Sequence, residues 1–255
     1  MSNEKSAVTV ADKSAVIIGG TTGIGRGIAR TFAEDGANVI ATSRSKDAVT
    51  KITEELRSIG AETTEVTCDV RDRTSIENLR DVAVDIFGEV DVLINSAGAT
   101  DHASLLEMTD SQWNQGIDVF LTGVFRACQI FGRSMDHGSI INISSMSGRQ
   151  IRENRPVYCA AKSGVNGLTR AAAVDLAPNI RVNAIAPGFV KTELSGERLA
   201  DGSPVREIID ERTPLNRVAD SDEIAGTAVY LASDAASFTT GEVLTVDGGY
   251  DRSAL

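Results

Sequence analysis

The sequence predicts an α/β fold in which a doubly wound parallel sheet is covered by helices on both faces. Two observations carry this prediction. Apolar runs of strand length alternate along the chain with amphipathic runs of helix length, and glycine closes several of these runs. With 255 residues, 42% of them hydrophobic, and neither an internal repeat nor a proline-rich linker, residues 1–255 are expected to form a single domain.

The first half of the chain supplies four predicted strands and three predicted helices. "SAVIIGG" is a continuous apolar run typical of a buried parallel strand, whereas "RGIARTFAEDG" has helical spacing and ends at Gly36. By the same criteria, strands are expected at 14–20, 37–43, 62–70 and 90–98, and helices at 26–36, 48–60 and 74–87.

The second half continues the alternation with longer helices. Its predicted helices cover 110–133, 157–176 and 220–232, and its predicted strands cover 139–143, 180–188 and 242–249. In such a sheet, ligands bind at the carboxyl ends of the strands.

Composition and charge exclude several classes of function. A net charge of −11 argues against nucleic-acid binding, which needs clustered positive charge. The apolar runs are too short to span a membrane, and no secretory signal precedes them. The three cysteines are scattered, and the two histidines, His102 and His137, do not add a metal-ligand spacing to them, so neither disulfides nor a metal site is expected. A reducing cytoplasm is therefore the predicted location. The acidic surface fits either a salt-rich cytoplasm or ordinary acidic solubility.

The loop "GGTTGIG" is a candidate phosphate-binding loop. Gly19, Gly23 and Gly25 follow the first predicted strand and open the first predicted helix. Backbone amides at a helix N-terminus favour anions, and glycine lets a pyrophosphate approach them without obstruction by a side chain. The strand–turn–helix context makes this interpretation stronger than a bare glycine pattern, which a tight turn would also explain.

Tyr158 and Lys162, in "YCAAK", are a candidate acid–base pair. They lie four residues apart in a predicted helix and therefore share one helix face. An isolated pair of this kind is most often a surface tyrosine beside a solvated lysine. An ammonium held ~4 Å from the phenol, at an effective dielectric of ~20, would favour phenolate by about 4 kcal/mol, or about three pK units. That shift would bring the phenol into the range of acid–base catalysis.

Ordered motifs along nearly the whole chain resemble those of the classical short-chain dehydrogenase/reductase family. The matching positions are Gly19, Gly23 and Gly25 (with Ile18 where Thr is usual), Asp69–Val70, "NSAG" at 95–98, Ser145, Tyr158 with Lys162, and "APGFVKT" with Val190 and Thr192. The resemblance implies one dinucleotide-binding and catalytic domain and hydride transfer between a nicotinamide and a carbonyl or secondary alcohol.

The resemblance also implies a role for each matched residue. Tyr158 would be the proton donor or acceptor, Ser145 would hydrogen-bond the substrate oxygen, and Lys162 would also hold the nicotinamide ribose. Ser144 is the rival of Ser145, but adjacent strand residues point in opposite directions. The positions implied in cofactor binding are Gly19, Thr22, Gly23, Ile24, Gly25, Ser43, Arg44, Asp69, Val70, Asn95, Ala97, Gly98, Tyr158, Lys162, Pro187, Gly188, Val190 and Thr192.

The end of the second predicted strand favours NADP(H) over NAD. NAD enzymes usually have an acidic residue there for the ribose 2′-hydroxyl, whereas an arginine accommodates the 2′-phosphate. In "TSRS", Ser43 occupies the acidic position and Arg44 follows it. NAD and an ordinary surface role for Arg44 remain the alternatives.

The substrate is less well defined by the sequence. Arg149, Arg152 and Arg155 lie between Ser145 and Tyr158, and arginine suits carboxylates and phosphates, so the substrate is expected to be anionic or polyhydroxylated, such as a sugar acid or a 3-oxoacyl thioester. Loop arginines at a subunit interface or paired to surface carboxylates are an equal alternative. The polar segment 193–214 is expected to be a lid over the site.

Three rival functions remain open at this level. An NAD-dependent sugar or polyol dehydrogenase would use the same site. A non-catalytic dinucleotide sensor would keep the glycine loop without needing Ser145, Tyr158 and Lys162 together, and a dehydratase or epimerase often carries a further C-terminal substrate domain.

The resemblance also points to one departure and to an assembly. Phe120 stands where the family has an asparagine that supports a kinked helix and a proton-relay water. Either another polar group or bulk solvent holds that water, which is the favoured interpretation, or Phe120 has become part of an apolar wall in a slower enzyme. A homotetramer through the helices at 110–133 and 157–176 is expected, with a dimer as the alternative.

Overall fold

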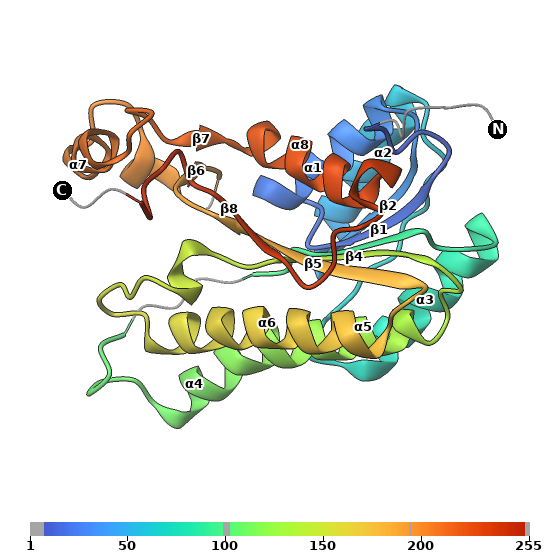
Figure 1. The fold of residues 1–255 in the computed structure, drawn as a ribbon, viewed down its shortest axis with the longest axis horizontal. Helices are drawn as coiled ribbons and strands as arrows, with labels where there is room; N and C mark the ends of the chain where they lie inside the picture. The colour runs from blue at the N-terminus through green and yellow to red at the C-terminus, as the bar shows by residue number, and fades with distance from the viewer. Residues whose placement is uncertain (1–7, 99–102, 194, 253–255) are drawn as a thin grey trace.

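A six-stranded parallel sheet forms the centre of the molecule (Figure 1) in the computed structural model, which describes residues 8–98, 103–193 and 195–252. The strand order is β2-β1-β3-β4-β5-β8, and every neighbouring pair is parallel. The strands are β1 (Ser14–Ile18), β2 (Asn38–Thr42), β3 (Val92–Asn95), β4 (Gly138–Ile143), β5 (Ile180–Pro187) and β8 (Val243–Val246). Two short strands, β6 (Val190–Lys191) and β7 (Ala219–Asp220), pair separately.

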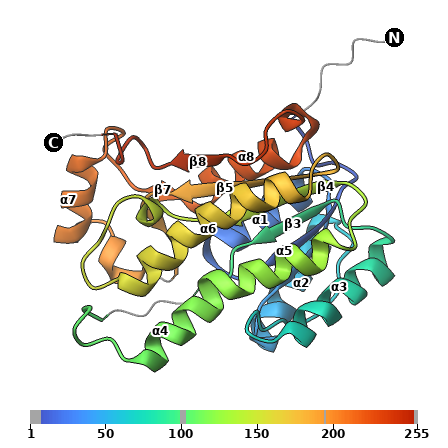
Figure 2. The same ribbon diagram turned by 60° about the horizontal axis from the view of Figure 1, so that its bottom comes forward.

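Helices cover both faces of the sheet, so the predicted fold class is confirmed. One face carries α1 (Gly23–Glu34), α2 (Lys46–Ile59) and α8 (Ser221–Ala232). The other carries α3 (Arg73–Phe87), α4 (Asp110–Ile117), α5 (Gly123–Gly132) and α6 (Pro156–Asp175). Figure 2 looks onto this second face, where α4 and α5 follow one another in a line and α6 lies beside them. The remaining helix, α7 (Pro204–Arg212), lies at one end of the molecule.

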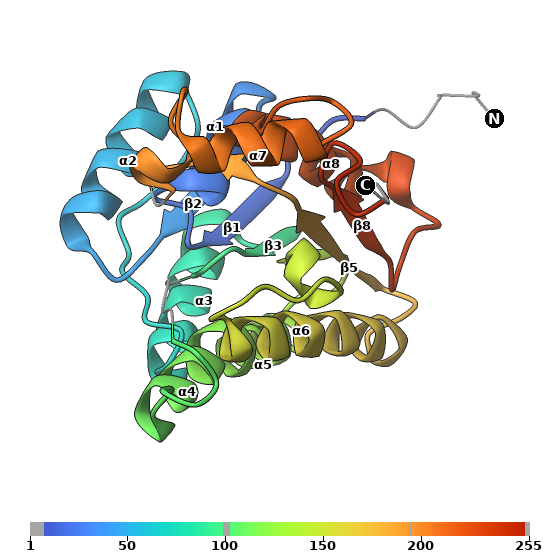
Figure 3. The ribbon, with the colours of Figure 1, turned by 90° about the vertical axis from the view of Figure 1, so that its left-hand side faces the viewer.

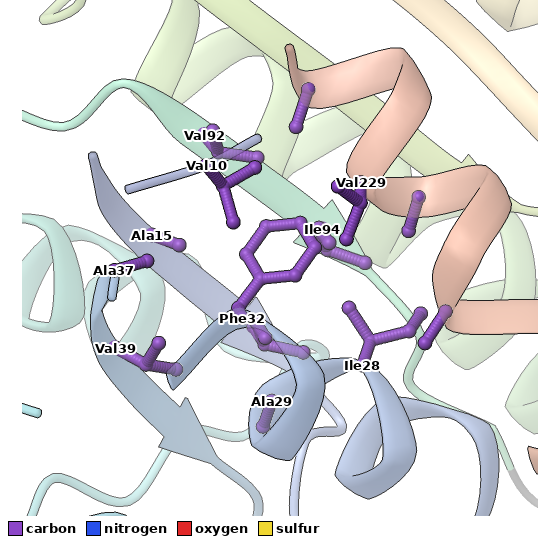
Figure 4. Packing of buried hydrophobic residues seen from close by; sticks show 14 of the residues in the cluster. Val10, Ala15, Ile28, Ala29, Phe32, Ala37, Val39, Val92, Ile94 and Val229 are labelled. Atoms are coloured by element: carbon purple, nitrogen blue, oxygen red, sulfur yellow. The ribbon is translucent and has the colours of Figure 1, made fainter. Parts of the chain in front are cut away.

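The core consists of two apolar clusters separated by the sheet. On β1, Ala15 and Ile17 belong to the cluster beneath α1 and α8, whereas Val16 and Ile18 belong to the cluster above α3 and α5. Alternate residues of a strand point to opposite faces, so a strand buried on both faces must be apolar throughout. Figure 4 shows the first cluster, with the fully buried Phe32 of α1 surrounded by side chains of the sheet and of α8.

Local signals set the helix ends. The Ser45 side chain accepts a hydrogen bond from the Ala48 amide at the start of α2, which ends at Gly60 in the left-handed region with φ 107°. Thr109 and Gln112 form a capping box at the start of α4. These polar caps pair backbone groups that a helix terminus would otherwise leave without partners.

Two predicted elements differ in the structure. Residues 62–70 form no strand, because only a few isolated hydrogen bonds join them to β2, among them Val39 N to Glu62 O and Cys68 N to Ser43 O. The helix expected at 110–133 is interrupted by a π-helical segment, Asp118–Thr122, between α4 and α5. Phe120 lies within this segment, so the π-helical turns form here without the asparagine.

The three cysteines, Cys68, Cys128 and Cys159, are free and buried. Among the described helices, none combines the length and the apolar character needed to cross a bilayer. The segment expected to be a lid contains the 3₁₀ turn η3 (Gly196–Leu199) and α7, and Leu199 and Ile209 pack there with Val218. Leu194 of this segment lies outside the described residues.

Candidate active site

A cavity of about 880 Å³ opens where the carboxyl ends of the strands converge. Five consecutive strands of the sheet each contribute the residues that follow their last position. Gly19 follows β1, Ser43 follows β2, Ala97 follows β3, Ser145 follows β4 and Gly188 follows β5, and all five line the cavity. Figure 3 views the molecule from the side on which α7 lies. Helix α7 contacts the 3₁₀ turn η3, whose residues Arg198 and Leu199 line the cavity. The location agrees with the rule for open parallel sheets.

The glycine loop has a geometry that only glycine permits. Gly19 has φ +82°, and a Cβ there would lie 2.5 Å from the Ala97 backbone nitrogen. A Cβ on Gly25 would lie 2.1 Å from the Gly19 carbonyl oxygen, so Gly25 lets α1 pack closely against the loop. The first residue of α1 is Gly23, whose amide faces the cavity lining. These residues fit the pyrophosphate of a dinucleotide, which helix N-termini bind through backbone amides.

Most of the residues predicted to bind the cofactor line this one cavity. Gly25 and Asn95 lie outside the lining. The predicted cofactor contact of Asn95 is corrected by the structure, because its buried side chain donates a hydrogen bond to Asn142 Oδ1 at 2.9 Å and so joins β3 to β4 instead of facing a ligand. Those that line the cavity are Gly19, Thr22, Gly23, Ile24, Ser43, Arg44, Asp69, Val70, Ala97, Gly98, Tyr158, Lys162, Pro187, Gly188, Val190 and Thr192.

Arg44 and Asp69 lie together at the β2 end of the cavity. Arg44 is exposed. Asp69 forms an ion pair with Arg71, with Nη2 and Oδ2 2.6 Å apart. The Asp69 pKa is lowered, first by its hydrogen bond to Arg71 and, as a smaller contribution, by the charge of Arg44. The Asp69 charge is therefore matched by Arg71, and Arg44 leaves this end of the cavity positive.

Ser145, Tyr158 and Lys162 meet where β4 ends beneath α6. The Ser145 hydroxyl is hydrogen-bonded to the Tyr158 phenol. Lys162 is buried, and its Nζ donates to the Ile143 carbonyl oxygen at 2.7 Å. Ser144 is used elsewhere, because its hydroxyl donates to Asn166 Oδ1 at 2.6 Å. The geometry therefore favours Ser145 over Ser144 as the candidate catalytic serine.

The pKa of Tyr158 differs from the sequence expectation. Burial raises it above its usual value, and this effect outweighs the Ser145 hydrogen bond and the charges of Arg155 and Arg152, which lower it. Lys162 Nζ is 5.7 Å from the Tyr158 ring centroid and turns towards Ile143, and burial lowers its own pKa to about 8. The expected activation of the phenol by a nearby lysine is therefore wrong for this arrangement, and Tyr158 is held as a neutral phenol.

Phe120 closes one side of this group. Its ring lies 5.4 Å from Lys162 Nζ and packs edge-on against Tyr158 with centroids 5.1 Å apart. Only 4% of the residue is exposed. Of the two sequence interpretations, this packing favours Phe120 as part of an apolar wall.

Three functional candidates in the lining were not singled out from the sequence. Phe189 provides a ring under Arg152, Arg198 comes from η3, and the Glu193 carboxylate accepts a hydrogen bond from the Gly23 amide at 3.0 Å. These three residues are far in sequence from the cavity residues that they contact or accompany, and no local sequence pattern identifies them as site residues. Arg149, expected to border the pocket, is exposed and lies outside the lining.

Three side chains that could together ligate a metal lie outside the cavity lining. Ligand atoms of Glu89, Asp91 and His137 lie within 4.8 Å of one another. Asp91 already accepts a hydrogen bond from the Ser14 amide at 2.8 Å. This group therefore has a structural explanation, while His102 lies outside the described residues.

Comparison with known proteins agrees with this site. The family model described as "Enoyl-(Acyl carrier protein) reductase" matches residues 19–251. The 3-oxoacyl-(acyl-carrier-protein) reductase FabG of Thermotoga maritima is 37% identical over 93% of this chain and 97% of its own. The cis-4-hydroxycyclohexanecarboxylate dehydrogenase of Sinomonas cyclohexanicum is 41% identical, covering 94% of this chain and 97% of its own.

A solved structure extends the agreement to the backbone. A short-chain type dehydrogenase/reductase from Mycobacterium marinum superposes with a TM-score of 0.89 at 35% identity, covering 95% of this chain and 97% of that one. The cavity is lined by the glycine loop and the first residue of α1, as expected for a nicotinamide dinucleotide site, and the names of the relatives state reductase or dehydrogenase activity. The chain therefore belongs to the short-chain dehydrogenase/reductase family of oxidoreductases.

Proposed function

We propose that this enzyme transfers a hydride between NADP(H) and a carbonyl or secondary alcohol, with Ser145, Tyr158 and Lys162 as its catalytic residues. One observation carries the proposal: these three residues lie at one end of a cavity whose other wall holds the glycine loop and Arg44. A non-catalytic dinucleotide sensor would have no need of a buried lysine and a hydrogen-bonded serine–tyrosine pair at that position.

The residues have distinct tasks in this proposal. When bound, the nicotinamide supplies or takes up the hydride. Tyr158 is a phenol at neutral pH and is therefore ready to donate a proton to a carbonyl oxygen during reduction. Ser145 orients the phenol and the substrate oxygen by hydrogen bonds. Lys162, anchored on Ile143 O, presents a positive charge to the cofactor ribose.

Two substrate classes are supported by the relatives and the lining. The substrate is polar or anionic, either a sugar acid or similar hydroxy acid or a 3-oxoacyl thioester. The name of the Thermotoga maritima relative states an acyl-thioester substrate, and that of the Sinomonas cyclohexanicum relative states a hydroxy acid. An NAD-dependent sugar or polyol dehydrogenase remains the alternative, because within the described residues the preference for NADP(H) rests on the adjacent Ser43 and Arg44.

The assembly and the location are further parts of the proposal. A homotetramer would cover apolar side chains that the single chain exposes, including Phe125 on α5 at 43% and Val174 on α6 at 77%. Light scattering that gives a monomer at working concentration would contradict this assembly. We also infer a single domain and a cytoplasmic location, in keeping with its three free cysteines.

The decisive experiment follows reduced-nicotinamide absorbance across alcohols, ketones, sugar acids and acetoacetyl thioesters, with NADP(H) and NAD(H) in parallel. Tyr158→Phe removes the proposed proton donor and should abolish most turnover while NADPH still binds. Tyr250→Phe is the matched control, because Tyr250 is buried against Phe189 outside the cavity lining. Near-normal turnover by Tyr158→Phe would contradict the proposed mechanism, and binding without turnover by the unmodified protein would favour a sensor.

A further inference from the structure

Three arginines surround the end of the cavity at which Tyr158 lies. Arg152 and Arg155 belong to the loop before α6, and Arg198 belongs to η3 on the segment after β6. All three line the cavity together with Ser145 and Tyr158. The guanidinium groups therefore reach one space from two segments that are distant in the sequence.

Aromatic rings hold two of these guanidinium groups in place. The Arg152 carbon Cζ lies 4.9 Å from the centroid of the Phe189 ring, and the Arg155 Cζ lies 5.6 Å from that of Tyr158. Stacking on a ring face restricts the orientation of a guanidinium group. Arg155 is thus positioned beside the phenol that contacts the reacting oxygen in the proposed mechanism.

The arginines are close enough to repel one another. Burial lowers the pKa of Arg152 and Arg155, and the charge of Arg198 lowers the pKa of both further. Within the described residues, neither Arg152 nor Arg198 forms an ion pair with a carboxylate. This is unusual in a chain with 36 acidic residues, where Arg206 and Arg217 are both paired. An external anion would offset the repulsion.

We propose that Arg152, Arg155 and Arg198 form a subsite for a substrate carboxylate that is separated from the reacting oxygen by only a few bonds. Planar guanidinium groups bind carboxylates through paired hydrogen bonds. The subsite rests on the proposed function and selects between its two substrate classes. The enzyme acts on compact hydroxy or oxo acids, not on long 3-oxoacyl thioesters, because a carrier thioester has no carboxylate and its phosphate is separated from the carbonyl by the whole pantetheine arm.

The position of Arg155 supports the short separation. A carboxylate held at Arg155 lies next to the Tyr158 ring, so the acid and the reacting carbon must belong to one small molecule. An acyl thioester would place only methylene and thioester groups against Arg152 and Arg198, neither of which is paired with a carboxylate among the described residues, so these two charges would stay uncompensated.

The test compares a charged and a neutral substrate of the same shape. The probes are cis-4-hydroxycyclohexanecarboxylate and cis-4-methylcyclohexanol, with NADP and NAD measured in parallel. The variants are Arg152→Met, Arg155→Met and Arg198→Met, and the matched control is Arg149→Met on the same loop but outside the cavity lining. Arg198→Met is the sharpest variant, because Arg198 is not among the charges that act on Tyr158.

We expect the unmodified enzyme to prefer the acid, and we expect each of the three variants to lower the ratio of kcat/KM for acid over alcohol by about tenfold or more. The loss should fall mainly on KM, since the subsite binds the substrate without taking part in the chemistry. Arg149→Met should keep the ratio of the unmodified enzyme. Acid preference that persists in Arg198→Met and Arg152→Met would overturn the subsite, as would a higher kcat/KM for acetoacetyl-coenzyme A than for the acid.

A binding measurement separates this proposal from the proposed function. Calorimetric titration of the NADP-bound protein with cyclohexanecarboxylate should show binding that the carboxamide analogue lacks and that Arg198→Met weakens. If neither alcohol is oxidised, the proposed function is contradicted, while carboxylate-selective binding still supports the subsite. If both alcohols are oxidised equally and the carboxylate does not bind, the proposed function stands and the subsite is wrong.

Discussion

The ring of Phe120 stands edge-on to the ring of Tyr158, with planes at 85° and centroids 5.1 Å apart. The same ring lies 5.4 Å from Lys162 Nζ, so an apolar group contacts both members of the candidate acid–base pair. The ammonium lies over the face of the Phe120 ring, which attracts the charge weakly but has no lone pair or N–H group to hold a relay water as an asparagine would. The proton of Tyr158 must therefore be exchanged by another path, and the packing explains why burial dominates both pKa values.

Phe120→Asn tests the importance of that wall. The reaction type should stay the same, and kcat/KM should change by no more than about tenfold, or about 1.4 kcal/mol of barrier, because Ser145 and Tyr158 still provide the proton donor. The pKa of Lys162 should rise, since an amide oxygen would stabilise the ammonium. Steady-state kinetics and the pH–rate profile measure both effects.

Phe238→Asn is the control, because Phe238 is fully exposed and lies outside the cavity lining. A gain well above tenfold in Phe120→Asn alone would show that the proton path limits the rate of the natural enzyme.

Glu193 and the glycine loop give a second prediction. The Glu193 carboxylate accepts a hydrogen bond from the Gly23 amide and lies 3.9 Å from Arg26 Nη1. It thus occupies a helix N-terminus at which a cofactor pyrophosphate is expected, and its charge disfavours that anion. Glu193→Gln should bind NADPH several-fold more tightly, as fluorescence titration would show. Glu197→Gln removes the same charge from the same segment outside the lining and should leave the affinity unchanged. Weaker binding by Glu193→Gln would argue that the carboxylate supports the loop.

Much of the fold could be predicted because its signals are local. Continuous apolar strands, helical spacing and closing glycines located every strand of the large sheet and all helices except α7 and the break between α4 and α5. The strand predicted at 62–70 was wrong. Val66, Cys68 and Val70 are buried in alternation, as in a strand, but the segment makes too few hydrogen bonds to β2 to form a ladder. The π-helical segment Asp118–Thr122 interrupts a run whose apolar spacing is otherwise helical, so the spacing alone did not reveal it.

Sequence motifs predicted which residues form the candidate site, but they did not predict how the side chains of those residues are oriented. The residue pattern indicated the glycine loop and the Tyr158–Lys162 pair, the family resemblance indicated Ser145, and in the structure Gly19, Gly23, Ser145, Tyr158 and Lys162 line one cavity. The sequence also places Tyr158 and Lys162 on one helix face, but the direction of the Lys162 ammonium depends on the Ile143 carbonyl, and its desolvation depends on Phe120. Contacts between residues that are distant in the sequence therefore determine the pKa values of Tyr158 and Lys162.

Arg44 is expected to set the preference for NADP over NAD. It is exposed at the cavity end next to Asp69, whose charge is already matched by Arg71, so its guanidinium remains available to a 2′-phosphate. Arg44→Met should lower kcat/KM with NADP by roughly tenfold to a hundredfold and change that with NAD by less than about threefold, as expected for loss of a charge-assisted phosphate contact. Lys51→Met removes one positive charge from α2 outside the lining and should change neither value. Equal efficiency with both cofactors before any substitution would refute the assignment.

Burial of Lys162 should make the stability of the cofactor-free protein depend on alkaline pH. Its folded-state pKa is lowered to about 8 from the ordinary lysine value of 10.5, so between these values the unfolded chain binds more protons than the folded one. Stability therefore rises with pH across this window, by up to about 1.4 kcal/mol per unit and about 3 kcal/mol in total, and the destabilising effect of burying the charge is fully present below pH 8. Urea unfolding of the natural protein and of Lys162→Met at pH 7, 8, 9 and 10 isolates this contribution, because the other titrating groups are common to both. The difference in unfolding free energy should move in favour of the natural protein above pH 8, and a difference that stays constant to pH 10 would show that Lys162 is not desolvated in solution.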